Sequence, residues 1–229
     1  MNARILEIFR SVQGEGKYLG VTQIFVRFFE CNMHCVWCDT PHSIGDTTRH
    51  YQEFALEKLV GEIKNLWSPC HSVSLTGGEP LMQAEFIKTL IPVLRSLRMP
   101  VYLETNGVLP QELASVIDGI DIIAMDIKLP SSTGCQAYWQ EHEDFIKVAQ
   151  GKDFFIKTVI SNNTTLEDVK RASDMVSRIA PDALFILQPN YFDMKDGVVA
   201  KCIEFQNHCQ KYLSNVRIIP QIHKFLKVR

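Results

Sequence analysis

The pattern that most constrains this chain is a regular alternation of apolar, β-favouring segments with segments whose apolar residues recur at helical spacing. The alternation repeats about six times, without a low-complexity linker or a shift in composition. It predicts right-handed βα units and a parallel sheet covered on both faces. We therefore expect one α/β domain over residues 1–229. The expected strands are residues 5–9, 23–29, 72–75, 101–103, 120–125, 154–160, 183–187 and 216–219, and the expected helices are residues 53–66, 84–98, 111–117, 136–150, 165–179 and 195–213.

Composition and charge exclude several classes of protein. The formal net charge is −2, so no global basic field indicates a nucleic-acid partner. No apolar run approaches the roughly 20 residues of a membrane span, and the first residues lack the apolar region of a signal peptide. We expect a cytoplasmic protein without a membrane partner. In that reducing compartment its seven cysteines are thiols or metal ligands rather than a disulfide framework.

Three of the cysteines, Cys31, Cys35 and Cys38, are spaced C-x3-C-x2-C directly after the second expected strand. This arrangement can hold three thiolates toward one point, which leaves a four-coordinate metal or a four-iron cluster one ligand short. A structural zinc site takes four protein ligands, and the fourth could only be His34, His42 or a distant residue. Thiolates are the normal ligands of iron–sulfur clusters. We expect a [4Fe–4S] cluster with one open iron; a zinc site and a purely structural role for the cysteines are the alternatives.

Polar and glycine motifs follow almost every expected strand. In βα barrels the loops after the strands converge on one mouth, where active sites are built. Each motif alone is compatible with an ordinary turn, but together they predict a wide polar mouth that faces the cysteines. The motifs are TGGEP at residues 76–80, ETNG at 104–107, DIK at 126–128, QPN at 188–190 and PQIHK at 220–224.

The cysteine spacing, with Trp37 just before the last cysteine, resembles the cluster loop of the radical S-adenosylmethionine (SAM) enzymes. The GGEP sequence at residues 77–80 resembles their second hallmark, which binds the methionyl amino group. Within that superfamily, nearly the whole chain is similar to the 7-carboxy-7-deazaguanine synthase family. One departure is Glu30, where the family commonly has glycine before the first cysteine. The matching segments are residues 11–16 (SVQGEG), Arg27, residues 38–40, 104–107, 126–128 with 130–132, 188–189, and Gln221 with His223 and Lys224.

The resemblance implies a shortened, open (β/α)6-type partial TIM barrel in a homodimer. It implies conversion of 6-carboxy-5,6,7,8-tetrahydropterin to 7-carboxy-7-deazaguanine and ammonia, in the biosynthesis of 7-deazapurines such as queuosine. The implied cofactors are one [4Fe–4S] cluster per subunit, SAM that is regenerated in each turnover, and Mg²⁺. The implied partners are the pterin substrate and an electron donor such as flavodoxin or ferredoxin.

The resemblance also implies roles for individual residues. Arg27 suits a substrate carboxylate because a guanidinium forks onto two oxygens. Thr40 would ligate Mg²⁺, and His223 would either meet the substrate or be a capped loop histidine. The cluster ligands would be Cys31, Cys35 and Cys38. SAM would be held by Trp37, Cys38, Asp39, Gly78, Glu79, Asp126, Ile127, Lys128, Gln188, Pro189, Asn190 and Tyr191. The substrate would be held by Val12, Gln13, Gly14, Glu15, Arg27, Thr76, His223 and the terminal carboxylate of Arg229.

Two further readings compete with this one. The first is another small radical SAM enzyme, such as a glycyl-radical activase, against which the SVQGEG and PQIHK segments speak. The second is a zinc-stapled binding protein without catalysis. The metal distinguishes them, because iron and sulfide in about equal amounts exclude the zinc protein.

Overall fold

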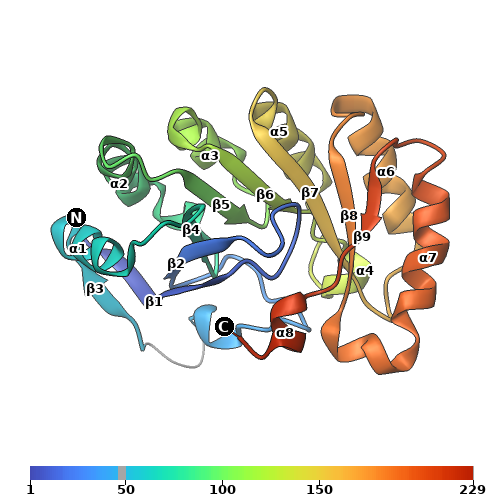
Figure 1. Cartoon of the computed structure of the whole chain (residues 1–229). Helices are drawn as coiled ribbons and strands as arrows, with labels where there is room; N and C mark the ends of the chain where they lie inside the picture. Colours follow the sequence, from blue (N-terminus) through green and yellow to red (C-terminus); the bar gives the residue numbers. More distant parts are fainter. Residues whose placement is uncertain (46–49, 229) are drawn as a thin grey trace.

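A nine-stranded sheet runs through the computed structural model, which describes residues 1–45 and 50–228 (Figure 1). The strand order is β3-β1-β2-β4-β5-β6-β7-β8-β9, so among the described residues the sheet is open at β3 and β9. Strands β2 and β4 to β9 are parallel neighbours, whereas β1 runs antiparallel to β2 and β3. The expected open, mostly parallel α/β sheet is confirmed. The strands are β1 Ala3–Val12, β2 Thr22–Phe28, β3 Gln52–Phe54, β4 Ser72–Gly77, β5 Val101–Thr105, β6 Ile122–Asp126, β7 Asp153–Ile160, β8 Leu184–Pro189 and β9 Val216–Ile218.

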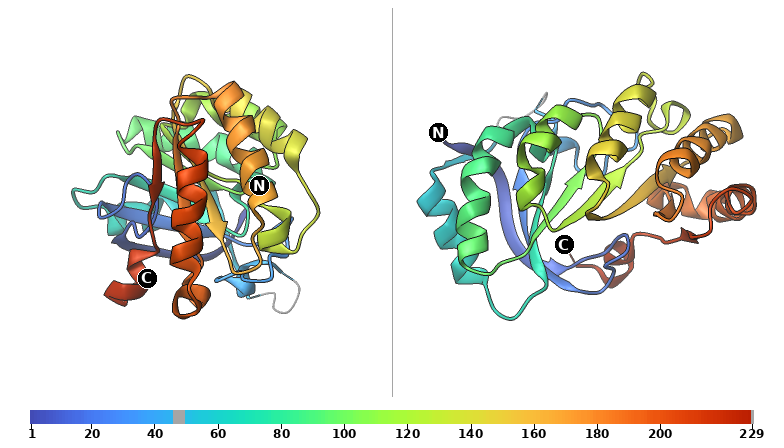
Figure 2. Two further views of the ribbon diagram at one scale, coloured as in Figure 1. Left: turned by 90° about the vertical axis from the view of Figure 1, so that its right-hand side faces the viewer. Right: turned by 90° about the horizontal axis from the view of Figure 1, so that it is seen from above.

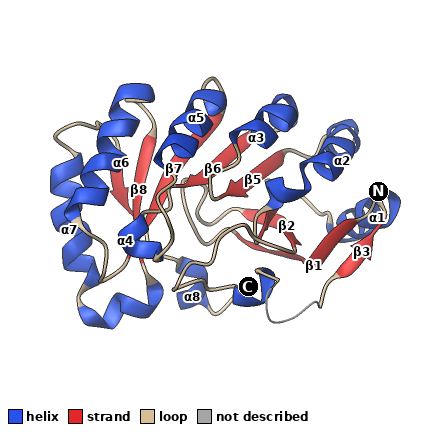
Figure 3. Ribbon diagram, turned by 180° about the vertical axis from the view of Figure 1, so that it is seen from behind, coloured by secondary structure: helices blue, strands red, loops and turns tan. Residues whose placement is uncertain are grey.

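The longer helices cover the outer, convex face of the curved sheet, as Figures 2 and 3 show. Their apolar faces and the outward-facing strand residues form the main core, which includes Leu59, Ile87, Phe145 and Phe185. None of the described helices is long and apolar enough to cross a membrane. The helices are α1 Leu56–Leu66, α2 Ala84–Ser96, α3 Pro110–Val116, α4 Pro130–Thr133, α5 Trp139–Ala149, α6 Leu166–Ile179, α7 Val198–Cys209 and α8 Ile222–Leu226.

The inner face of the sheet carries an apolar cluster at one end and lines a cavity toward the carboxyl ends of the strands. Successive strand residues point to opposite faces, so alternate residues share the inner face. On β7 these are Phe155, Lys157 and Val159. Phe155 packs with Tyr102 of β5 in a small apolar cluster, whereas Lys157 and Val159 line a cavity. The barrel therefore has an apolar base, and its polar residues lie toward the carboxyl ends of the strands.

Three expected helices begin three residues later in the structure; one of them, expected at 136–150, begins at Trp139. The helix expected at 53–66 begins at Leu56, because residues 52–54 form β3 and extend the sheet beside β1. The helix expected at 195–213 is preceded by a 3₁₀ segment, Tyr191–Asp196, and α7 begins after Gly197. Gly197 has φ +87°, a left-handed conformation that separates the two segments.

Proline and short helices account for the other differences. Pro92, where the sequence favours a kink or a break, does not end α2, which runs from Ala84 to Ser96 with this proline inside it. Pro92 and Lys88, whose carbonyl loses its helical partner, are both exposed, so water can replace the missing hydrogen bond. Residues 129–134, which lie between an expected strand and an expected helix, contain α4. Pro130 is in its first turn, where the missing N–H costs nothing. Helix α8 falls in the segment 220–224 that was expected only as a polar motif.

A buried histidine of α5, His142, leads us to expect that the stability of the protein depends on pH. His142 of α5 is fully buried; its Nδ1 lies 3.0 Å from the Gly107 carbonyl oxygen, and its Nε2 accepts from the Lys128 N–H at 3.1 Å. Burial lowers the pKa of His142 from 6.5 to about 4. The unfolded chain therefore binds a proton at higher pH than the folded chain, and stability is lost as pH falls from about 6.5 to about 4.

We expect His142→Gln to lose less stability than the wild type between pH 7 and pH 4, by about 3 kcal/mol. Urea denaturation of the two proteins at several pH values measures this difference. His50→Gln is the matched control, because His50 is exposed and should leave the wild-type dependence in place. An equally steep loss of stability in His142→Gln would contradict the prediction.

Candidate active site

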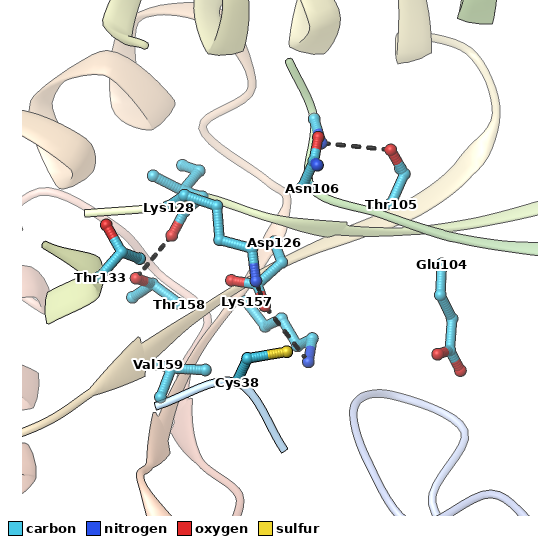
Figure 4. Close-up of polar contacts among 12 residues, drawn as sticks. Cys38, Glu104, Thr105, Asn106, Asp126, Lys128, Thr133, Lys157, Thr158 and Val159 are labelled. Carbon is cyan, nitrogen blue, oxygen red and sulfur yellow. Dashed lines mark hydrogen bonds and ion pairs between the residues drawn. The ribbon is translucent and has the colours of Figure 1, made fainter. Parts of the chain in front are cut away.

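A cavity lies at the carboxyl ends of the parallel strands and is lined by the cysteine loop on one side. Each of the strands β2, β4, β5, β6, β7 and β8 contributes at least one polar side chain to it. Figure 4 shows several of them around the shared mouth. The polar lining from these six strands is Arg27, Thr76, Glu104, Asp126, Lys157 and Gln188. The predicted polar mouth facing the cysteines is therefore present.

The cysteine loop is held by α4, which sequence reasoning did not predict. The Val36 N–H donates to the Thr133 carbonyl at 2.9 Å, and the Trp37 indole N–H donates to the Ser132 carbonyl at 2.6 Å. Within the loop, the Cys38 N–H donates to the Cys35 carbonyl at 3.0 Å. These contacts fix the loop from outside, so its thiols can face the cavity.

The three cysteines are partly buried and line the cavity together. Burial raises the pKa of Cys31 to about 11 and that of Cys35 to about 12, even though the Lys128 ammonium lowers both. Thiolates in this environment need a strong positive charge to stabilise them, and bound iron supplies it. A soft, all-sulfur donor set in a partly buried loop fits an iron–sulfur cluster.

The loop begins at a strained residue that lies against a glycine turn. Glu30 has φ +84°, a left-handed conformation that is unusual for a residue other than glycine. Its N–H donates to the Ser43 carbonyl at 2.8 Å, and its own carbonyl accepts from the Glu79 N–H at 2.9 Å. A Cβ atom on Gly78 would lie only 2.1 Å from the Glu30 carbonyl oxygen. Gly78 therefore allows the TGGEP turn and the cysteine loop to touch through their backbones.

Glu79 of the TGGEP motif does not line the cavity. It is fully buried, and its carboxylate accepts from the Leu81 N–H at 3.1 Å, the Thr105 hydroxyl at 2.9 Å and the Asn106 N–H at 2.8 Å. Burial raises the pKa of Glu79 to about 7, despite these hydrogen bonds. In this structure Glu79 ties the turn after β4 to the turn after β5, and its role toward SAM stays a prediction.

Two buried acceptors on the cavity wall have no hydrogen-bond partner among the described residues. They are Asp126 Oδ1 and Gln188 Oε1. Both residues are more than nine-tenths buried and line the cavity. A buried acceptor without a partner is costly, so a ligand that supplies donors here is favoured. The amino and hydroxyl groups of SAM meet that requirement.

A second part of the cavity wall carries a network centred on Glu104 of β5. Its carboxylate accepts from the Gln13 amide and from the Thr76 hydroxyl, each at 2.7 Å. Near it, the Arg27 Nε donates to Glu7 at 2.7 Å, which leaves further N–H donors of the guanidinium for a ligand. This wall therefore offers both acceptors and donors to a polar ring system.

The C-terminal segment closes the cavity between the two walls. The Gln221 amide donates to Glu15 at 2.7 Å and to Asp39 at 3.1 Å. His223 packs so closely on Gly14 that a Cβ there would lie 2.3 Å from the ring. Glu15, Asp39 and His223 place ligand atoms within 4.8 Å of one another. Both carboxylates also have lysine partners, Lys157 and Lys224, so this group is already neutralised.

The structure brings most of the predicted site residues to this one cavity. Arg229 lies outside the described residues. Sequence reasoning gave no role to Glu104, Lys157 or Gln221, although the first and last lie inside recognised motifs. The predicted residues that line the cavity are Val12, Gln13, Gly14, Glu15, Arg27, Cys31, Cys35, Trp37, Cys38, Asp39, Thr40, Thr76, Gly78, Asp126, Lys128, Gln188, Asn190 and His223. Those that do not are Glu79, Ile127, Pro189 and Tyr191.

Comparison with known proteins agrees with this geometry. The profile of the Radical SAM superfamily matches residues 26–179. The chain is 38% identical to the 7-carboxy-7-deazaguanine synthase of Geobacter sulfurreducens, over 98% of this chain and 97% of that protein. It is 34% identical to the synthase of Archaeoglobus fulgidus over the full length of both. The chain belongs to the 7-carboxy-7-deazaguanine synthase family.

A solved structure supports the fold of this synthase family member. The crystal structure of QueE from Escherichia coli superimposes with a TM-score of 0.67 at 21% identity, over 96% of this chain and 94% of that one. At that identity the likeness concerns the fold alone. Membership of the radical SAM superfamily implies a [4Fe–4S] cluster and SAM, and both fit the thiols and unpartnered acceptors described above.

The strained Glu30 gives a test of the cluster loop. Compared with Glu30→Ala, Glu30→Gly should be about 1 kcal/mol more stable, because glycine avoids the left-handed penalty of roughly 1–2 kcal/mol. Both variants lose the Arg4–Glu30 ion pair equally, so the difference reports the backbone alone. Chemical denaturation of the cluster-free proteins measures it, and iron analysis after reconstitution checks that the loop is intact. Equal stability of the two variants would show that Glu30 is not strained.

Proposed function

We propose that this protein is a radical SAM lyase that converts 6-carboxy-5,6,7,8-tetrahydropterin to 7-carboxy-7-deazaguanine and ammonia. The observation that carries the proposal is the convergence of the cysteine loop, the SVQGEG segment and the PQIHK segment on one cavity. The full-length likeness to named synthases supports the same reaction. The presence of the SVQGEG and PQIHK segments at the cavity argues against a glycyl-radical activase.

The proposed division of the cavity follows its two walls. Cys31, Cys35 and Cys38 would hold the cluster, which when bound supplies one electron to SAM and thereby the radical chemistry. The unpartnered acceptors of Asp126 and Gln188 would take donors of SAM. The backbone of Gly78 provides the close approach that a side chain would block.

The substrate would occupy the wall built from the SVQGEG segment. Arg27 would bind the substrate carboxylate through the donors that Glu7 does not use. Gln13, Glu15 and Thr76 would present polar atoms to the pterin ring, and His223 lies beside them against Gly14. Holding the pterin and SAM in one enclosed cavity is what orients the reacting atoms and excludes water.

The remaining components are also proposals. Thr40 would ligate Mg²⁺ together with substrate and water oxygens, because its hydroxyl lines the cavity and Mg²⁺ prefers oxygen ligands. The protein would act as a homodimer and would receive electrons from a flavodoxin or ferredoxin. The support for these two assignments is family membership.

The deciding experiment is anaerobic incubation of the reconstituted protein with SAM, reductant, Mg²⁺ and the pterin, followed by mass analysis. We expect 7-carboxy-7-deazaguanine without stoichiometric loss of SAM. Cys38→Ala should abolish both product formation and SAM cleavage, because a cluster ligand is lost. Cys70→Ala is the matched control, since Cys70 is not among the residues that line the cavity. Cleavage of SAM with unchanged pterin would show that the substrate is wrong.

A separate measurement tests the Mg²⁺ site. Thr40→Ala should raise the Mg²⁺ concentration for half-maximal activity about tenfold, equivalent to ~1.4 kcal/mol, through loss of one oxygen ligand. Thr40→Ser keeps the hydroxyl and should stay close to the wild type. Iron content should be unchanged in both variants, and a parallel loss of iron in Thr40→Ala would refute the assigned role.

A further inference from the structure

Lys157 is a buried cation in the cavity that neither the sequence motifs nor the proposed ligand sites account for. It lies on the inner face of β7, and its side chain is 15% exposed. Its ammonium forms an ion pair with Glu15. It also lies 3.4 Å from Asp126 Oδ2, a contact that can be followed in Figure 4. Glu15 belongs to the proposed substrate wall and Asp126 to the proposed SAM wall. Lys157 therefore contacts both walls directly.

These ion pairs belong to a longer chain of contacts around the mouth. On the SAM side, the Lys128 ammonium donates to the same Asp126 oxygen at 2.9 Å and lies 5.1 Å from the centre of the Trp37 ring system. On the substrate side, the contacts continue from Glu15 through Gln221 to Asp39. Trp37 and Asp39 are two residues apart in the cysteine loop. The chain of contacts thus leaves the cysteine loop, passes through Lys157 and returns to the same loop.

The contacts of Lys157 and Glu15 shift the pKa of each in the direction that favours the charged form. Burial alone would lower the pKa of Lys157, but the Glu15 and Asp126 carboxylates raise it above its usual value. Burial would also raise the pKa of Glu15, yet Lys157 and Gln221 lower it to about 2. Lys157 consequently stays charged and cannot donate its proton readily. Its contribution is to hold two carboxylates at a set separation.

We propose that Lys157 is a positioning residue that couples substrate binding to SAM binding. This inference rests on the proposed function, which places the two ligands on Glu15 and Asp126. A donor from SAM that binds the unpartnered Oδ1 of Asp126 changes the strength of the ion pair between Asp126 Oδ2 and Lys157. The position of the Lys157 ammonium then changes, and so does the position of its other partner, Glu15. By reciprocity, the pterin changes the affinity for SAM by the same factor as SAM changes the affinity for the pterin.

Lys157→Met tests the inference because methionine keeps the length of the side chain and removes its charge. We expect the ratio of the SAM dissociation constants with and without pterin to move to about one. Product formation should fall about 100-fold, since small misplacements of bound reactants carry that cost. SAM should now be cleaved to 5′-deoxyadenosine without product. A purely structural role would not change the amount of SAM cleaved per product.

Three controls keep the outcome clear. Lys170→Met removes an exposed lysine of α6 and should behave as the wild type. Lys157→Arg keeps the cation and should recover part of the coupling. In the cluster-free chain, Lys157→Met should lower the melting temperature because two carboxylates lose their shared cation, and adding Glu15→Gln should restore part of it.

The result that overturns the inference is a Lys157→Met protein with wild-type coupling and wild-type SAM cleavage per product. The inference also fails if iron content and activity fall together while the SAM cleaved per product stays unchanged. If Lys157→Met does not fold, Lys157→Gln, which also removes the charge and keeps Glu15, carries the same comparison. Failure of the proposed function is separate, because it appears as absence of product from the wild type.

Discussion

The backbone contact between Glu30 and the turn at Gly78 is the constraint on which the site depends. At this point the loop that carries the three thiols meets the loop that follows the next parallel strand. The contact needs a left-handed residue on one side and a glycine on the other. Side chains cannot substitute for it, because the atoms that meet are amide and carbonyl groups. The position of the thiols relative to the rest of the cavity is therefore set by main-chain geometry.

This constraint places the strained residue next to a metal-binding loop, where strain of this kind is often found. Glycine would adopt this conformation without a steric penalty. Glutamate at position 30 gains an ion pair with Arg4 at the surface of the sheet. Such an exposed pair is worth at most about 1 kcal/mol and offsets only part of the strain.

The parallel sheet and its polar mouth could be predicted from sequence because both follow from short-range rules. Alternation along β7 puts Lys157 and Val159 on the side of the cavity, and each strand end carries a recognisable motif. The roles of α4 and Glu79 could not be predicted. Helix α4 is a single turn without a periodic apolar pattern, and Glu79 sits in a ligand-binding motif while its carboxylate bonds to the neighbouring turn. Both depend on contacts between segments far apart in the chain.

The strands at the two edges of the described sheet are short and carry exposed polar or charged residues. Strands β3 and β9 have three residues each, with Gln52 and Glu53 exposed on β3 and Arg217 exposed on β9. Short, polar edge strands are poor templates for pairing with another chain. An assembly of this protein would then have to form through helices or loops rather than through a continuous intermolecular sheet. The same short, polar edge strands also limit edge-to-edge aggregation of the chain.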